Sequence, residues 1–261
     1  MVTDIFKFNS AIVRVPSKSV VNGLRDKNIG TPCFNEIIKE HTRYVAALKN
    51  NGVHVYLLPS SERWPDSLFV EDPALVFPQG AILLRSIMTE RVGERDLIEP
   101  VLRSKFAKVL EVDSGYVDGG DILCTSDNII IGLSSRTTQE GAERLLKCLY
   151  DLGLSGVITD TPSGVLHLKS DCSLLDKKTV FVTPRLADSQ VFKNYKKIIT
   201  PETEYTAANA IRVNSSVFVS QDCLKSIELL EQSDFKITAL PSTEIRKLDG
   251  GLSCMSLRWF K

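Results

Sequence analysis

The chain of 261 residues carries balanced charge: Lys and Arg together number 32, Asp and Glu together number 32, and the formal net charge is +0. Without a basic block, neither a nucleic acid nor an anionic membrane surface is an expected partner. The hydrophobic content of 43% allows a sizeable core, and no stretch approaches the roughly 20 apolar residues that span a bilayer. We expect an ordinary soluble globular protein.

The N-terminus and the cysteines favour a cytoplasmic location. The sequence starts with MVTDIFKFNS, which lacks the basic segment and following apolar segment of a secretion signal. The six cysteines are spread along the chain without a CxxC motif or close spacing to histidine, which argues against a zinc site or a disulfide framework. A cysteine with a chemical role would then act as a thiolate nucleophile.

Five amphipathic helices are predicted along the chain, and a short apolar strand follows each of them. The helices are expected at residues 35–50, 93–106, 138–150, 189–196 and 222–232. The strands that follow them are expected at residues 53–58, 107–112, 156–159, 197–200 and 236–240.

Before four of these helices lies a pair of strands joined by a turn, so the repeating unit is strand, strand, helix, strand. The pairs are expected at 73–77 with 81–85, 120–124 with 128–132, 172–175 with 179–183, and 210–213 with 216–220.

The two ends of the chain complete this pattern. Only one strand, at 11–15, precedes the first helix, and one strand, at 254–259, is left over after the fifth unit. Because these two would form the missing pair, the pattern predicts an α/β ring of five ββαβ quasi-repeats around a central channel, with one domain spanning residues 1–261. From the pattern alone, an open α/β sheet is the alternative.

Three carboxylates interrupt an otherwise apolar segment, RWPDSLFVEDPAL: Asp66, Glu71 and Asp72. A carboxylate taken out of water is costly unless a cation or a set of hydrogen-bond donors meets it. The sequence leaves open whether that cation is internal or belongs to a ligand.

Three further residues suit nucleophilic chemistry, although each also has a purely structural interpretation. His167 lies between two leucines in VLHLKS, where a lone histidine is more often a core residue. Cys254 follows a glycine pair in LDGGLSCMSLRW and could be a small apolar residue of the last strand. Asp118 precedes another glycine pair in VDGGDIL and could simply cap a turn.

Two arginines, Arg85 and Arg136, are expected at strand ends, where each could bind a carboxylate or form a surface ion pair. Sorted by charge, the acids suit a planar cation, the arginines suit an anion, and the Cys, His and Asp set suits nucleophilic attack. An amino acid with a guanidinium at one end and a carboxylate at the other fits this set, provided that the ring brings the segments together.

The motifs RWPDSLFVEDPAL, VDGGDIL, IGLSSRTTQEGA, VLHLKS and KLDGGLSCMSLRW, in this order, resemble those of the dimethylarginine dimethylaminohydrolases. This family belongs to the guanidine-modifying superfamily and has the five-bladed α/β propeller, or pentein, fold. The resemblance runs from about residue 11 to the C-terminus. It implies hydrolysis of asymmetric dimethylarginine and monomethylarginine to citrulline and dimethylamine or methylamine, through a covalent thiouronium intermediate and without a metal or organic cofactor.

The resemblance also implies roles for individual residues. Cys254 matches the nucleophile, His167 the general acid and base, and Asp118 the carboxylate that orients the histidine, where the family often has Glu. The implied substrate contacts are Asp66 and Asp72, with Glu71 beside them, for the guanidinium, Arg85 and Arg136 for the α-carboxylate, and the backbone carbonyls of Leu24, in a mobile loop, and Leu248 for the α-amino group.

Two alternative functions stay open at this stage. An arginine or other guanidine deiminase shares the Cys, His and acid core and differs in the room for N-methyl groups. A non-catalytic pentein module, such as a ribosome-binding anti-association factor, would leave these residues without a common explanation, and the neutral charge offers no surface for RNA. A homodimer is compatible with the sequence, which does not specify an oligomeric state.

Overall fold

Fifteen strands form five three-stranded sheets in the computed structural model, which describes residues 5–261. Each middle strand, or the larger part of it, is a run of buried residues, as expected for a strand covered on both faces. The sheets contain β15 (Leu257–Trp259), β1 (Ser10–Arg14) and β2 (His54–Leu58); β3 (Ala74–Phe77), β4 (Gly80–Leu83) and β5 (Val109–Glu111); β6 (Ile122–Cys124), β7 (Ile129–Leu133) and β8 (Gly156–Asp160); β9 (Cys172–Leu174), β10 (Thr179–Val182) and β11 (Lys196–Ile199); and β12 (Ile211–Val213), β13 (Ser216–Ser220) and β14 (Lys236–Leu240).

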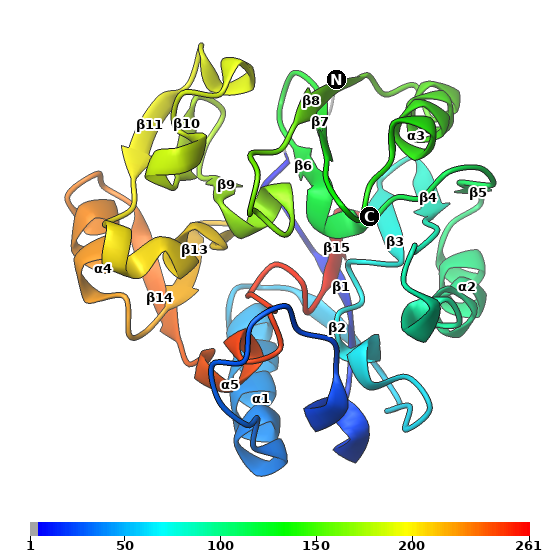
Figure 1. The fold of residues 1–261 in the computed structure, drawn as a ribbon, viewed down its shortest axis with the longest axis horizontal. Helices are drawn as coiled ribbons and strands as arrows, with labels where there is room; N and C mark the ends of the chain where they lie inside the picture. Colours follow the sequence, from blue (N-terminus) through cyan, green and yellow to red (C-terminus); the bar gives the residue numbers. More distant parts are fainter. Residues whose placement is uncertain (1–4) are drawn as a thin grey trace.

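Every sheet has the same pairing. The middle strand runs antiparallel to one neighbour and parallel to the other, which it reaches through a crossover. The crossover helices are α1 (Phe34–Asn50), α2 (Glu94–Lys105), α3 (Gln139–Asp151) and α4 (Leu224–Glu231), and a short helix, α5 (Thr243–Arg246), precedes the last strand. Figure 1 shows the sheets arranged around a centre with these helices outside them. The five-fold repeat is confirmed, and four of the five units have the full predicted ββαβ order.

The two ends of the chain close the ring as predicted. β1 pairs antiparallel with β15, so that Ser10 lies opposite Trp259 and Ile12 opposite Leu257. Each of the five buried apolar clusters lies between two adjacent sheets; one of them joins Ala11 of β1 to Phe218 of β13, across the junction of the first and last sheets. The open-sheet alternative is excluded, because every sheet packs against two neighbours.

One predicted helix is wrong. Residues 189–196 form only a 3-10 turn at Gln190–Phe192, and β11 already begins at Lys196. Within this segment only Phe192 is fully buried. A single apolar anchor over two turns cannot offset the cost of starting a helix, so the crossover of the fourth sheet stays irregular.

The remaining regular segments are short 3-10 helices that connect the strands. They comprise η1 (Lys18–Asn22), η2 (Pro65–Leu68), η3 (Thr89–Arg91), η4 (Gly119–Asp121), η5 (Leu168–Ser170), η6 (Pro184–Leu186), η7 (Gln190–Phe192) and η8 (Glu202–Ala208). Within residues 5–261, no helix has the length and apolar character needed to span a membrane.

Candidate active site

Four of the predicted site residues share one place in the repeat. Each lies in the segment just before the first strand of a sheet: Asp72 before β3, Asp118 before β6, His167 before β9 and Cys254 before β15. These first strands contact one another around the centre of the ring, β15 with β3, β6 with β9 and β9 with β12. Because the sheets repeat the same orientation, segments that are far apart in sequence meet at one end of the channel.

Most of the predicted site residues line one cavity at this end of the channel. Its lining includes Leu24, Asp66, Asp72, Arg91, Arg136, His167, Leu248, Asp249 and Cys254. Asp118 lies directly behind His167, whereas Glu71 and Arg85 do not line this cavity. The structure therefore brings together acids, a cation, the cysteine and the histidine, as an amino acid with a cationic side chain would require.

His167 and Asp118 form a buried pair. The Nε2 atom of His167 lies 3.4 Å from Oδ2 of Asp118, whose Oδ1 accepts a hydrogen bond from the backbone N–H of Gly120 at 3.0 Å. Burial lowers the pKa of His167, but the charges of Asp118 and of the neighbouring acids outweigh it and raise the pKa to about 9. The same pair holds the pKa of Asp118 below its usual value, although burial opposes this. His167 is therefore a cation at neutral pH.

Glycine is required beside this pair because the histidine ring packs directly on the backbone. A Cβ atom on Gly120 would lie 2.7 Å from Cγ of His167. The glycine pair that the sequence shows after Asp118 thus permits the close approach of the histidine ring.

Asp72 already meets an internal cation with one of its two oxygens. Its Oδ2 lies 2.7 Å from Nη1 of Arg91, which also pairs with Glu94 at 2.6 Å. Among the residues that the structure describes, the buried Oδ1 of Asp72 has no hydrogen-bond partner. Burial and the nearby charge of Asp118 raise the pKa of Asp72 to about 7, although Arg91 opposes the shift. Asp72 therefore presents one unpaired oxygen to the cavity.

Asp66 is held by the loop over the cavity. Its carboxylate accepts a hydrogen bond from the backbone N–H of Leu24 at 3.0 Å, and burial raises its pKa. A Cβ on Gly23 would lie 2.6 Å from this carboxylate, so a larger residue would push the loop away. The backbone N–H of Asp26 donates to the carboxylate of Asp249, which lines the cavity.

Cys254 lies opposite these acids in a turn before β15. Burial raises the pKa of its thiol to about 12, with Asp72 and Glu71 adding to the shift. Without a bound cation, the sulfur is therefore a neutral thiol.

Two of the residues predicted to contact substrate, Arg85 and Glu71, do not line this cavity. Arg85 is exposed, stacks over Tyr116 at 4.9 Å and does not line the cavity, because β4 ends at Leu83 and the chain turns outward after it. Arg91 lies in the cavity instead, where it pairs with Asp72 and Glu94. Sequence reasoning missed Arg91, for which the only signal was a basic residue three positions before an acid at a helix start.

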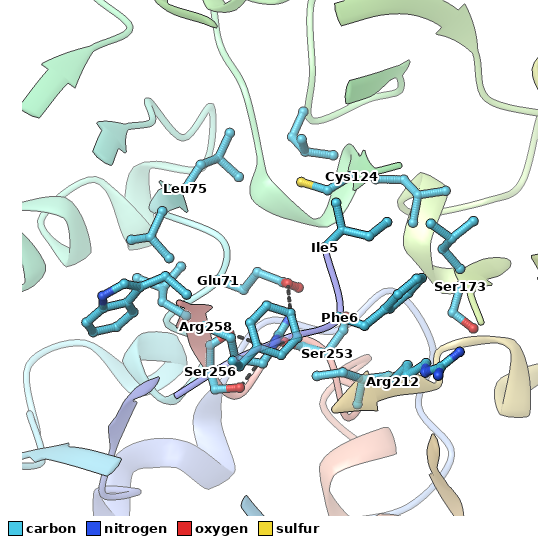
Figure 2. A pocket seen from close by; sticks show the side chains of 18 of the residues that line it. Ile5, Phe6, Glu71, Leu75, Cys124, Ser173, Arg212, Ser253, Ser256 and Arg258 are labelled. Carbon is cyan, nitrogen blue, oxygen red and sulfur yellow. Dashed lines mark hydrogen bonds and ion pairs between the residues drawn. The ribbon is translucent and has the colours of Figure 1, made fainter. Parts of the chain in front are cut away.

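Glu71 is the second predicted contact that lies outside the cavity. Its carboxylate forms ion pairs with Lys169 at 2.7 Å and with Arg258 at 2.9 Å. It lines a different, largely apolar cavity, whose lining Figure 2 shows from close by. Its cations are therefore internal, and it offers nothing to a ligand in the active-site cavity.

Arg136, the other predicted arginine, does line the cavity. It is largely buried, and its Nη2 lies 3.9 Å from Oδ1 of Asp26 in the loop above. This long ion pair leaves the guanidinium available to an anion. Within residues 5–261, no group of three His, Cys, Asp or Glu side chains could hold a metal ion.

Comparison with known proteins places these residues in context. The family model described as arginine deiminase matches residues 62–217. The chain is 35% identical to the N(G),N(G)-dimethylarginine dimethylaminohydrolase of Pseudomonas aeruginosa, with 97% of this chain and 100% of that protein covered.

Two solved structures are also similar to the chain, each at 35% identity. One is the Pseudomonas aeruginosa enzyme as a cysteine-to-serine variant complexed with citrulline, with a TM-score of 0.94 over 97% of this chain and 100% of the other. The second is a dimethylarginine dimethylaminohydrolase, a histidine-to-glycine variant as an adduct with S-methyl-L-thiocitrulline, with a TM-score of 0.93 over 96% and 99% of the two chains.

Proposed function

Because this chain belongs to the dimethylarginine dimethylaminohydrolase family, we propose that it hydrolyses Nω-methylated arginines to citrulline and methylamine or dimethylamine, with Cys254 as the nucleophile. The family membership expected from the motifs is confirmed. The observation that carries the proposal is the unpaired Oδ1 of Asp72, which lines the same cavity as Cys254 and His167. A buried acceptor without a donor fits a guanidinium N–H better than any other part of the substrate.

Substrate binding prepares the nucleophile. Asp66 and Asp72 hold the guanidinium in register, and the cation beside the sulfur lowers the pKa of Cys254, so that the thiol loses its proton to solvent. Since His167 is already a cation, it need not act as the base for this step. A cysteine that ionises at neutral pH or below without ligand would contradict this order of events.

The thiolate then attacks the central carbon of the guanidinium. His167 gives its proton to the departing amine, because an amide anion is not a viable leaving group, and an S-alkylthiouronium remains on Cys254. The neutral His167 next takes a proton from water, and the resulting hydroxide attacks the same carbon. Collapse of this intermediate breaks the carbon–sulfur bond while the hydroxyl proton passes to the departing sulfur, which releases citrulline and restores the thiol of Cys254.

The α-carboxylate and the α-amino group of the substrate also need partners in the cavity. We assign the α-carboxylate to Arg136, and the α-amino group to the backbone carbonyls of Leu24 and Leu248, which line the same cavity. Arg91 also lines this cavity, but its guanidinium already forms ion pairs with the carboxylates of Asp72 and Glu94.

The proposal extends to the whole chain and its location. We infer one catalytic domain over residues 1–261, since β1 and β15 from opposite ends of the chain share a sheet. We infer the cytoplasm as its location, because the six cysteines are all free, which suits a reducing compartment.

The deciding experiment is citrulline release by the purified, metal-free protein. Asymmetric dimethylarginine, monomethylarginine, symmetric dimethylarginine and arginine are compared side by side, with Cys254→Ala as the control. We expect turnover of the first two only, lost in the control. Preference for arginine would indicate a deiminase, and no turnover of any of the four would indicate a binding module.

A further inference from the structure

A cluster of three buried charges lies behind Cys254, on the side of the channel away from the substrate cavity. Lys169 and Arg258 each contact one oxygen of Glu71, at 2.7 Å and 2.9 Å. The three side chains are largely buried, and together they carry a net charge of +1. Figure 2 shows Glu71 and Arg258 side by side in the wall of the apolar cavity. Two buried cations around one carboxylate are costly to assemble, which calls for a role beyond filling space.

Arg258 holds the turn that carries the nucleophile. Its Nη1 donates to the backbone carbonyl of Ser253 at 3.0 Å and to that of Ser256 at 2.6 Å. The backbone N–H of Glu71 donates to the carbonyl of Cys254 at 3.2 Å. Three carbonyls of this short turn are thus fixed by two members of the same cluster.

Lys169 connects the cluster to the turn that follows His167. It belongs to η5, the 3-10 turn that starts directly after His167. A second, uncharged link joins the same two turns: the side-chain amide of Asn209 donates to the carbonyl of Lys169 at 2.9 Å and accepts from the N–H of Ser253 at 3.1 Å. The His167 and Cys254 turns are therefore tied twice, once with charge and once without.

We propose that Lys169, Glu71 and Arg258 are positioning residues, which lock the Cys254 turn against the His167 turn and place opposite charges behind the sulfur, of which Lys169 stabilises its thiolate and Glu71 destabilises it. This inference deepens the proposed function and rests on it for its kinetic consequences. The attraction of Lys169 and the repulsion of Glu71 both act on the ionisation of Cys254, in opposite directions. The other charged groups around the sulfur, which the variants below leave unchanged, are Asp66, Asp72, Arg91, Arg136, His167 and Asp249.

The first test needs no substrate. Alkylation of Cys254 by iodoacetamide, followed by mass spectrometry of the peptide that carries it, measures the thiolate directly at pH 7 to 9. Lys169→Met should slow alkylation about ten-fold, since one pKa unit corresponds to a factor of ten in thiolate. Glu71→Gln should accelerate it. Partial unfolding would move both variants in the same direction, so opposite signs separate the charge effect from a loss of structure.

The matched control is Arg212, a cation of the same apolar cavity whose side chain donates to the carbonyls of Leu175 and Asn214, neither of which belongs to the Cys254 turn. Arg212→Met should leave the alkylation rate of Cys254 within about two-fold, and Lys169→Arg should restore most of the wild-type rate. Thermal melting checks that each variant is folded. If Lys169→Met and Glu71→Gln shift the rate in the same direction, or no more than Arg212→Met, the proposal is overturned.

The second test follows turnover of asymmetric dimethylarginine. Because none of the three residues lines the substrate cavity, Lys169→Met should lower kcat about ten-fold and leave KM within about three-fold. Asn209→Leu, which cuts the uncharged link, should lower kcat without changing the pH dependence of alkylation. A rise in KM alone for Lys169→Met would contradict the proposal. If the wild-type protein shows no turnover, the proposed function fails, while the alkylation result still decides the role of the cluster.

Discussion

Glu71 and Asp72 are neighbours in sequence, are both acidic and are both buried, yet they line different cavities. Glu71 lines the apolar cavity, where each of its two oxygens forms an ion pair, one with Lys169 and one with Arg258. Asp72 lines the active-site cavity, where Arg91 forms an ion pair with one oxygen, and the other oxygen has neither an ion pair nor a hydrogen bond among the described residues. A complete set of partners indicates a structural carboxylate, whereas an incomplete one indicates a carboxylate that awaits a ligand.

Among changes in the active-site cavity, replacement of the proposed nucleophile should have the largest effect on activity. Cys254→Ser should lower kcat for asymmetric dimethylarginine at least about a thousand-fold, because a hydroxyl is far less ionised than a thiol and loss of a nucleophile costs this much or more in other enzymes. Citrulline release under saturating substrate measures it. A variant that kept most of its activity would rule out the covalent mechanism.

Replacing one acid at a time tests the comparison between the two sides. Asp72→Asn should raise KM for asymmetric dimethylarginine and lower kcat/KM about 100-fold, since a hydrogen bond to a charged group contributes about 1.5–3 kcal/mol. Glu71→Gln should leave KM within about three-fold, because its side chain does not line the substrate cavity. Equal increases of KM in both variants would show that the partners of the two acids do not separate their roles.

The ion pair of His167 with Asp118, beside the active-site cavity, also contributes to the stability of the fold. The pKa of His167 rises from 6.5 to about 9 on folding, so the pair stabilises the fold fully below pH 6.5 and loses this contribution as the pH rises through 9. The difference in free energy of unfolding between wild type and His167→Gln should therefore shrink by roughly 3 kcal/mol across this window. Urea is the denaturant of choice, because guanidinium would occupy the site. A constant difference from pH 6 to 10 would contradict the raised pKa.

The smallest effect is expected outside both cavities. Arg85→Ala should change kcat/KM less than about two-fold, because Arg85 is exposed and stacks on Tyr116 rather than on substrate. Arg136→Ala, its counterpart at the mouth, should lower kcat/KM about 30-fold through KM, since a hydrogen bond between charged groups contributes about 1.5–3 kcal/mol. Comparable losses of kcat/KM in both variants would show that Arg85 does contact the substrate.

Much of the fold and the chemistry could be predicted from the sequence, because both leave local signals. The alternation of apolar runs with turns repeats five times, and unpaired strands at the two ends predict a closed ring. Glycine pairs mark the turns of Asp118 and Cys254, and the family motifs surround His167. The one regular element predicted wrongly, the helix at residues 189–196, lies where a short segment has a single buried anchor.

The sequence by itself predicted the repeat and the ring, and its family motifs named the candidate reacting groups, since strand and helix periodicity and the chemistry of side chains are properties of short segments. Only the tertiary structure decided that Arg91 rather than Arg85 enters the cavity, and that Glu71 turns away from it toward Lys169 and Arg258. These choices depend on the direction of side chains in irregular turns and, for Glu71, on partners more than 90 residues away. No local pattern encodes them, because a charge buried in one segment is satisfied by whichever other segment the closed ring places beside it.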